Sequence, residues 1–217
     1  MMELDTCPVS GETPEEERLN YLTHFFGLIL CLVGCPWLLF YAIKTGSMMN
    51  IMSCILYSIT LITMYLISTY YHACQKTDRK KLLRMIDHIC IYLLIAGSYT
   101  PFALGLLYAH NGVLLLAAVW CMAIVGIILK IVAFNRFRMI SLLLYLLMGW
   151  LVIVNMHTLQ MLASAETLFW LVAGGIIYTA GTIFYVWEQA PYNHAVWHLF
   201  VLGGSLSHYF SILYLFA

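Results

Sequence analysis

The residues best suited to chemistry are two histidines near the end of the chain. His194 and His198 are four positions apart, which places both imidazoles on one face of a helix, one turn apart. A helix offers two nitrogen ligands to one metal ion at this spacing. The same face continues at steps of three and four residues through Val201, Ser205 and His208, so we expect it to point into the protein.

A third histidine and a carboxylate complete a candidate metal site. Ser68 and His72 repeat the four-residue step, and Asp87 opens the next hydrophobic segment. Three imidazoles with a nearby carboxylate suit a catalytic zinc, which has three protein ligands and a water molecule. Zinc lowers the pKa of its water toward neutrality, and Asp87 would then orient that water or accept its proton. Ser68 would hydrogen-bond the water, a ligand or an oxyanion.

Each of these features also has an ordinary structural interpretation. A histidine pair in a membrane helix can simply hydrogen-bond neighbouring helices. Ser68 alone is typical of a packing serine that bonds its own backbone. Asp87 could pair with Arg84 at the water interface. His88 points about 100° away from Asp87 on an ideal helix, so it is left outside the ligand set.

A second polar group precedes the first hydrophobic segment. Glu17, Asn20 and His24 step by three and four residues. They could form an outer ring of hydrogen bonds around the metal ligands, or a gate. The alternative is a plain helix start, where the helix dipole favours acidic side chains. The spacing fits both interpretations equally.

Hydrophobic helices must position these residues. Of the 217 residues, 63% are hydrophobic and 9% are charged, whereas soluble domains carry about 25% charged residues. We predict an all-α, polytopic membrane protein, a seven-transmembrane-helix bundle without the alternation of barrel strands. The polar residues 1–19 should form a cytoplasmic N-terminal segment, and residues 20–217 the membrane domain. The predicted spans are 21–43, 51–72, 87–108, 113–134, 139–162, 167–187 and 194–216.

The basic residues predict the orientation. When the chain is threaded through seven spans, nine of its ten lysines and arginines fall on the side of the N-terminus, and Lys44 falls on the other. Basic residues concentrate on the cytoplasmic side, so the N-terminus should be cytoplasmic and the C-terminus outside. Lys130, late in the fourth span, can snorkel to that side. A net charge of zero without a basic soluble portion argues against nucleic acid binding.

Threading also brings the ionisable residues of the spans to one depth. Odd spans begin and even spans end on the cytoplasmic side, where the following residues then meet: His24, His72, Asp87, His88, His194 and His198. Ionisable side chains are costly in a bilayer and mark functional sites. Their convergence from several helices favours the metal site over the separate structural interpretations. His110, His157 and His208 fall in the opposite half and are not expected to belong to the site.

Four motifs follow one another along the chain. They are Glu17-x-x-Asn20-x-x-Thr23-His24, Ser68-Thr-Tyr-Tyr-His72, the run from Asp87-His88 to Pro101-Phe102, and His194-Ala-Val-Trp197-His198-Leu-Phe. In this order they resemble the hemolysin III family, which belongs to one superfamily with the progestin and adipoQ receptors. The resemblance runs from about Glu17 to the C-terminus. The short chain is similar to the bacterial branch, which implies the bacterial inner membrane.

The resemblance implies a fold and a set of ligands. In the receptor branch the fold is seven helices with a cytoplasmic N-terminus, and three histidines hold a zinc ion. The matching positions here are His72, His194 and His198. Asp87 matches the aspartate that contacts the zinc-bound water, and Ser68 matches the serine of the same motif.

Two functions of different classes follow as expectations. The first is a Zn²⁺-dependent hydrolase of lipid amides or esters, because some receptor relatives and the alkaline ceramidases of the superfamily are regarded as such enzymes. Its partners would be membrane lipids, among them a ceramide-like acyl lipid. The second is a non-enzymatic receptor or membrane-homeostasis protein with a structural zinc. A cytolytic activity, which the name hemolysin suggests, has little support in an integral inner-membrane chain.

Overall fold

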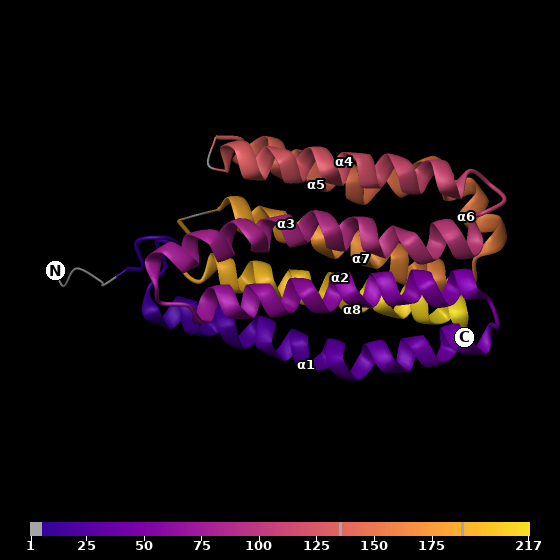
Figure 1. The fold of residues 1–217 in the computed structure, drawn as a ribbon, viewed down its shortest axis with the longest axis horizontal. Helices are drawn as coiled ribbons and strands as arrows, with labels where there is room; N and C mark the ends of the chain where they lie inside the picture. The colour runs from indigo at the N-terminus through magenta and orange to yellow at the C-terminus, as the bar shows by residue number, and fades with distance from the viewer. Residues whose placement is uncertain (1–5, 135, 188) are drawn as a thin grey trace.

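The computed structural model describes residues 6–134, 136–187 and 189–217. Within these residues all regular structure is helical, and seven helices are long and apolar enough to cross a membrane. They lie side by side along the long axis of the molecule, with the two termini at opposite ends (Figure 1). The predicted all-α, seven-helix architecture is confirmed.

Five spans are single α-helices and two contain a change of helix type. The bounds are α1 Pro14–Lys44, α2 Met48–Ala73, α3 Thr77–Pro101 followed by a π-helical turn Phe102–Leu106, α4 Gly112–Ala133, α5 Arg138–Trp150 joined by a 3-10 turn Leu151–Asn155 to α6 Met156–Leu162, α7 Ala165–Val186, and α8 Asn193–Phe216. All seven spans begin earlier than predicted, and the difference is largest for α1, at 14 instead of 21, and α3, at 77 instead of 87. Hydropathy marks the apolar part of a helix, whereas hydrogen bonding continues into its polar turns.

The early start of α1 has a local cause. Thr13 and Glu16 form a capping box, in which each side chain accepts a hydrogen bond from the other residue's backbone N–H. Pro14 occupies the first turn, where its missing N–H costs nothing. Residues 14–19, expected within the polar N-terminal segment, are therefore the first turns of α1. They carry Glu17 to the end of the bundle where α2 stops.

A tyrosine side chain of α3 makes hydrogen bonds with backbone groups at the 3-10 turn of the fifth span. The Tyr99 hydroxyl, on α3, donates to the carbonyl oxygen of Met148 at 2.7 Å. The same hydroxyl accepts from the N–H of Val152 at 2.9 Å, inside the 3-10 turn of the fifth span. Such partners are needed where a helix breaks at membrane depth. Pro101 ends α3, and the π-helical turn follows it directly.

The helices pack in a defined order, with α1 against α2 and α8, α2 against α3, and α7 against α8. Glycines allow the closest of these approaches. A Cβ atom on Gly204 of α8 would meet the Tyr178 ring of α7 at 2.6 Å, and one on Gly181 would meet Phe200 at 2.5 Å. These glycines bring α7 and α8 into close contact, while α1 packs against both α2 and α8.

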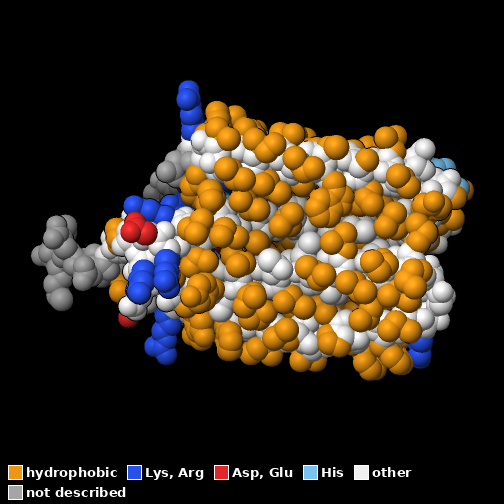
Figure 2. Space-filling view, in the orientation of Figure 1, with side chains coloured by type: hydrophobic (Ala, Val, Ile, Leu, Met, Phe, Trp, Pro, Cys, Tyr) orange, Lys and Arg blue, Asp and Glu red, His pale blue; other side chains and the backbone are white. Residues whose placement is uncertain are grey.

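On the face that Figure 2 shows, hydrophobic side chains cover the length of the molecule, while most of the lysine, arginine and acidic side chains gather at the end that carries the N-terminus. Exposed apolar residues include Val33, Val132 and Val154. A surface of this kind suits lipid rather than water. The cytoplasmic orientation of the charged end stays a prediction from its basic residues.

Candidate metal centre

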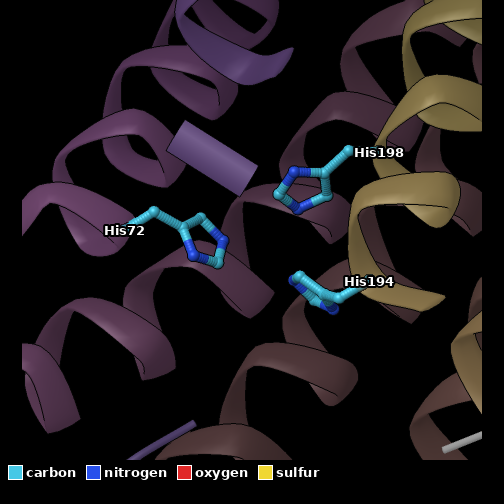
Figure 3. Close-up of side chains that lie close together, drawn as sticks. All are labelled: His72, His194 and His198. Atoms are coloured by element: carbon cyan, nitrogen blue, oxygen red, sulfur yellow. The ribbon is translucent and has the colours of Figure 1, made fainter. Parts of the chain in front are cut away.

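Three histidines converge at the end of the bundle that carries the N-terminus. His72 comes from the last turn of α2, and His194 and His198 come from the first two turns of α8. Their rings point toward one another across the gap between the helices (Figure 3). Ring nitrogens of all three lie within 4.8 Å of one another. Two of the three, His72 at 5% and His198 at 2% exposure, are buried, and the cluster could hold one metal ion.

Glu17 fixes the orientation of His72. The His72 Nδ1–H donates to Glu17 Oε2 at 2.8 Å, and Glu17 Oε1 receives the Lys80 ammonium at 2.9 Å. His72 Nε2 is buried and, among the described residues, has no hydrogen-bond partner. A histidine whose Nδ1–H is held by a carboxylate presents its Nε2 lone pair, which is the usual arrangement of a metal-ligating histidine. Lys80 was not identified from the sequence.

α1 also holds His198. Its Nδ1 lies 3.1 Å from the Thr23 hydroxyl and 3.2 Å from the backbone carbonyl oxygen of Asn20. The Thr23 hydroxyl donates to backbone carbonyls of its own helix, so it can accept from the imidazole. His198 Nε2 is then left for a ligand. In the sequence analysis Thr23 appeared only as a motif residue without a role. Its contact with His198 joins α1 to α8, and the spacing of residues within one helix cannot predict such a contact.

His24 and Asn20 lie directly beside His198. The His24 ring stacks on the His198 ring with centroids 3.5 Å apart and planes 14° from parallel. Both ring nitrogens of His24 and both side-chain polar atoms of Asn20 are buried without a partner in the described part of the chain. A buried polar atom left unpaired costs about 1–3 kcal/mol. Water or an ion at this position would satisfy all four atoms.

Asp87 and Ser68 lie beside each other, on neighbouring helices. Both residues are buried, on α3 and α2. Asp87 interacts electrostatically with the Ser68 hydroxyl and with Arg84, while the Ser68 oxygen makes no hydrogen bond to any described residue. Asp87 is not a member of the three-histidine group. Its predicted contact through water, and both catalytic assignments, stay predictions.

A largely apolar cavity opens on one side of the cluster. It is lined by residues of α1, α2, α3, α5, α7 and α8, and holds about 1150 Å³ of unfilled space including its open side. His24, which stacks on His198, lines it together with Asp87. Val201, Ser205 and His208 line it further along α8, so this face of α8 points inward as predicted. Ser205 forms a 2.7 Å hydrogen bond with the Tyr178 hydroxyl.

A polar pocket opens on the other side. His72, His194 and His88 line it, together with residues of the N-terminal segment such as Glu12. Asp87 and His88, neighbours in sequence, therefore face different cavities. Burial and the nearby carboxylates of Glu16 and Glu17 raise the pKa of Glu12 to about 7.

The chain matches the family model of haemolysin-III related proteins over residues 13–209. The chain belongs to the haemolysin-III family. It is 41% identical to the hemolysin-3 homolog of Bacillus subtilis (strain 168) over 202 residues, which cover 93% of this chain and 95% of that relative. It is 42% identical to hemolysin-3 of Bacillus cereus over 200 residues, which cover 92% and 91%.

A more distant relative is human. The chain is 29% identical to the monocyte to macrophage differentiation factor of Homo sapiens over 224 residues, which cover 95% of this chain and 88% of that relative. No solved structure matches the chain. The bacterial branch predicted from the short chain is confirmed by the Bacillus relatives. With its seven membrane-spanning helices, the chain is a multi-pass integral protein of the bacterial plasma membrane.

Proposed function

We propose that this haemolysin-III protein is a zinc-dependent hydrolase of lipid amides or esters, similar in reaction to a ceramidase. One observation carries the proposal. The histidine cluster that could hold a metal lies between a polar pocket, which water can enter, and an apolar cavity lined by Asp87. A lipid hydrolase needs a water supply and an acyl-chain site to meet at one reactive centre.

His72, His194 and His198 would hold the zinc ion. Three neutral imidazoles suit zinc, and the unpaired Nε2 of His72 fits this role. When bound, zinc supplies a Lewis acid that polarises a carbonyl and lowers the pKa of water. Glu17 and Thr23 keep the rings of His72 and His198 in position from the side away from the ion.

Asp87 and Ser68 would do the proton chemistry. The Asp87 carboxylate accepts a proton from the attacking water as its oxygen bonds to the acyl carbon. The same group then gives the proton to the leaving amine nitrogen or alkoxide oxygen as the old bond breaks. The Ser68 hydroxyl, beside Asp87, donates to the developing oxyanion. The acyl chain of the lipid lies in the apolar cavity.

Asp87→Asn tests this mechanism. We expect the variant to keep its metal and to lose turnover by at least about 100-fold, because it cannot take up a proton. His194→Ala and His198→Ala should lose metal and activity together. The measurements are elemental analysis of purified protein and fatty-acid release from ceramide-like lipids in nanodiscs. An Asp87→Asn protein that hydrolyses these lipids at the wild-type rate contradicts the mechanism.

A structural zinc in a non-enzymatic receptor or membrane-homeostasis protein is the second candidate. It is favoured because the three candidate ligands come from two helices, α2 and α8, which both pack on α1. An ion bound by all three histidines would join the ends of these two helices. In that case a chelator lowers the melting temperature while wild-type protein releases no fatty acid. A cytolytic activity, suggested by the names of the Bacillus relatives, is not proposed, because the chain forms a membrane bundle.

A further inference from the structure

His208 is an ionisable residue within a membrane span that the proposed metal centre does not use. It lies on the inward face of α8, ten residues beyond His198, which corresponds to about 15 Å along the helix axis. Ionisable side chains are costly in a bilayer and mark functional sites. The surroundings of His208 indicate which ligand it suits.

His208 stands where two cavities meet. The apolar cavity that Asp87 lines adjoins a smaller one, which holds about 510 Å³ of unfilled space including its open side. The residues that line both spaces are Ser98, Tyr99, Gly149, Trp150, Gly175 and His208. A chain that extends from one cavity into the other therefore passes beside His208.

The His208 ring has a polar atom without a partner. Its Nδ1 is buried and makes no hydrogen bond to any residue that the structure describes. The ring packs near Tyr178, with centroids 5.6 Å apart. A Cβ atom on Gly174 of α7 would meet its Nε2 at 2.6 Å, so the absence of a side chain there makes room for the imidazole. A buried polar atom left unpaired is costly, and a ligand that pairs with it is favoured.

The other polar side chains at this junction are mostly engaged. The Tyr99 hydroxyl is bonded to backbone groups of the fifth span. The Trp150 Nε1–H donates to the Thr179 hydroxyl at 2.9 Å, and that hydroxyl donates to a backbone carbonyl of its own helix at 2.7 Å. The Ser98 hydroxyl also donates to its own helix, at 2.8 Å, and its oxygen can still accept. The junction thus offers an imidazole and an accepting oxygen.

A hydroxyl group fits these two partners. A neutral imidazole has one donating and one accepting nitrogen. A ligand hydroxyl can accept from the ring N–H and donate to the Ser98 oxygen, or donate to the accepting ring nitrogen. A ketone or ester oxygen only accepts, so it cannot use Ser98. A carboxylate would lose its hydration among apolar side chains without a cation to offset the cost.

We infer that His208 and Ser98 bind a hydroxyl group on the acyl chain of a lipid in the apolar cavity. The inference rests on the proposed function, which places the acyl chain there. It narrows the substrate class to lipids whose acyl chain carries a hydroxyl about 15 Å from the bond that is hydrolysed. We call His208 and Ser98 the hydroxyl site.

Binding to the purified full-length protein tests the inference without any turnover. Displacement of tritiated stearic acid measures the affinities of unlabelled stearic acid, 12-hydroxystearic acid and 2-hydroxystearic acid, whose hydroxyl lies next to its carboxyl group. We expect 12-hydroxystearic acid to bind at least about 5-fold more tightly than either of the others, because only its hydroxyl reaches the hydroxyl site. Equal affinities, tighter binding of 2-hydroxystearic acid, or no displaceable binding overturns the inference.

Variants of His208 locate the site. His208→Phe keeps a ring and removes both nitrogens, so stearic acid should then bind more tightly than 12-hydroxystearic acid, whose hydroxyl would be buried unpaired. His208→Asn returns a polar atom to the position of Nδ1 and should restore the preference for 12-hydroxystearic acid. His157→Phe replaces an exposed histidine of α6 and should keep the wild-type preference. A wild-type preference in His208→Phe overturns the inference.

Ser98→Ala takes the place of His208→Phe if that protein does not fold. It removes the accepting oxygen and should lower the preference for 12-hydroxystearic acid by at least about 3-fold. An unchanged preference in this variant overturns the inference.

Metal content and hydrolysis, measured on the same samples, separate this inference from the proposed function. His208→Phe should keep the metal content of wild type, because His208 is not one of the three candidate ligands. Wild-type protein that prefers 12-hydroxystearic acid but contains no metal and releases no fatty acid supports the hydroxyl site and refutes the zinc hydrolase. Metal-loaded protein that hydrolyses ceramide-like lipids without a preference among the three acids does the reverse.

Discussion

At the scale of single residues, Glu17 of α1 orients His72, one of the three candidate metal ligands. Its two oxygens join the His72 imidazole to the Lys80 ammonium. The charge of the carboxylate raises the basicity of the imidazole and fixes which ring nitrogen carries the proton.

Glu17→Gln should therefore weaken metal binding by about 10–100-fold while the three histidines stay in place. Competition with a chelator of known affinity measures the change. Glu15→Gln, an exposed position in the same turn, is the matched control and should leave the affinity unaltered. Unchanged affinity in Glu17→Gln would remove Glu17 from the site.

Glu12 makes stability depend on pH. Its pKa is raised to about 7 in the fold, whereas an ordinary Glu titrates near 4.3. Between these values the unfolded chain loses the proton and the folded chain keeps it, so stability falls as the pH rises through this window. Glu12→Gln should melt at the same temperature as wild type below pH 4 and at a higher temperature at pH 8. A constant difference across the range would contradict this assignment.

At the scale of helices, α7 and α8 are brought together by glycines, and this contact shapes the wall of the apolar cavity. Gly204 lies against the Tyr178 ring, whose hydroxyl is bonded to Ser205. Gly203, next to it, has an ordinary contact distance of 3.4 Å for an added Cβ.

Gly204→Ala should destabilise the protein by about 1–3 kcal/mol, because the added methyl group displaces the Tyr178 ring. Gly203→Ala is the control and should change stability much less. Thermal melting in detergent measures both. Equal effects of the two variants would show that the contact does not limit packing.

Local sequence predicted the membrane spans but not the exact helix starts or the break in the fifth span. The seven spans were predicted because hydropathy records burial in lipid directly. The starts of α1 and α3 were placed too late, since polar turns at Pro14 and Thr77 continue each helix beyond its apolar part. The 3-10 turn in the fifth span has no proline to mark it, and Tyr99 of another helix stabilises it.

The candidate site was likewise predicted only in part from the sequence. His72, His194 and His198 were predicted from their spacing and from threading alone, because ionisable residues in a span have few other uses. Thr23 and Lys80 were missed, since each contacts the site from a helix distant in sequence.

At the scale of the whole molecule, charge and apolar surface divide the bundle into a polar end and a hydrophobic length (Figure 2). The predicted orientation places the polar end in the cytoplasm, with Lys44 outside. Alkaline phosphatase fused after Ala217 should be active, and a fluorescent protein at the same point should stay dark. The opposite pattern would reverse the orientation and place the polar pocket outside the cell.

His194 is only partly buried, and it lines the polar pocket with His72. An ion held there would exchange with the aqueous phase at the charged end without any separation of the helices. Loading would then follow membrane insertion, and occupancy would track the free metal of one compartment. A membrane-impermeant chelator should strip inside-out vesicles and spare right-side-out ones, which would make the protein a gauge of metal supply on a single face of the membrane.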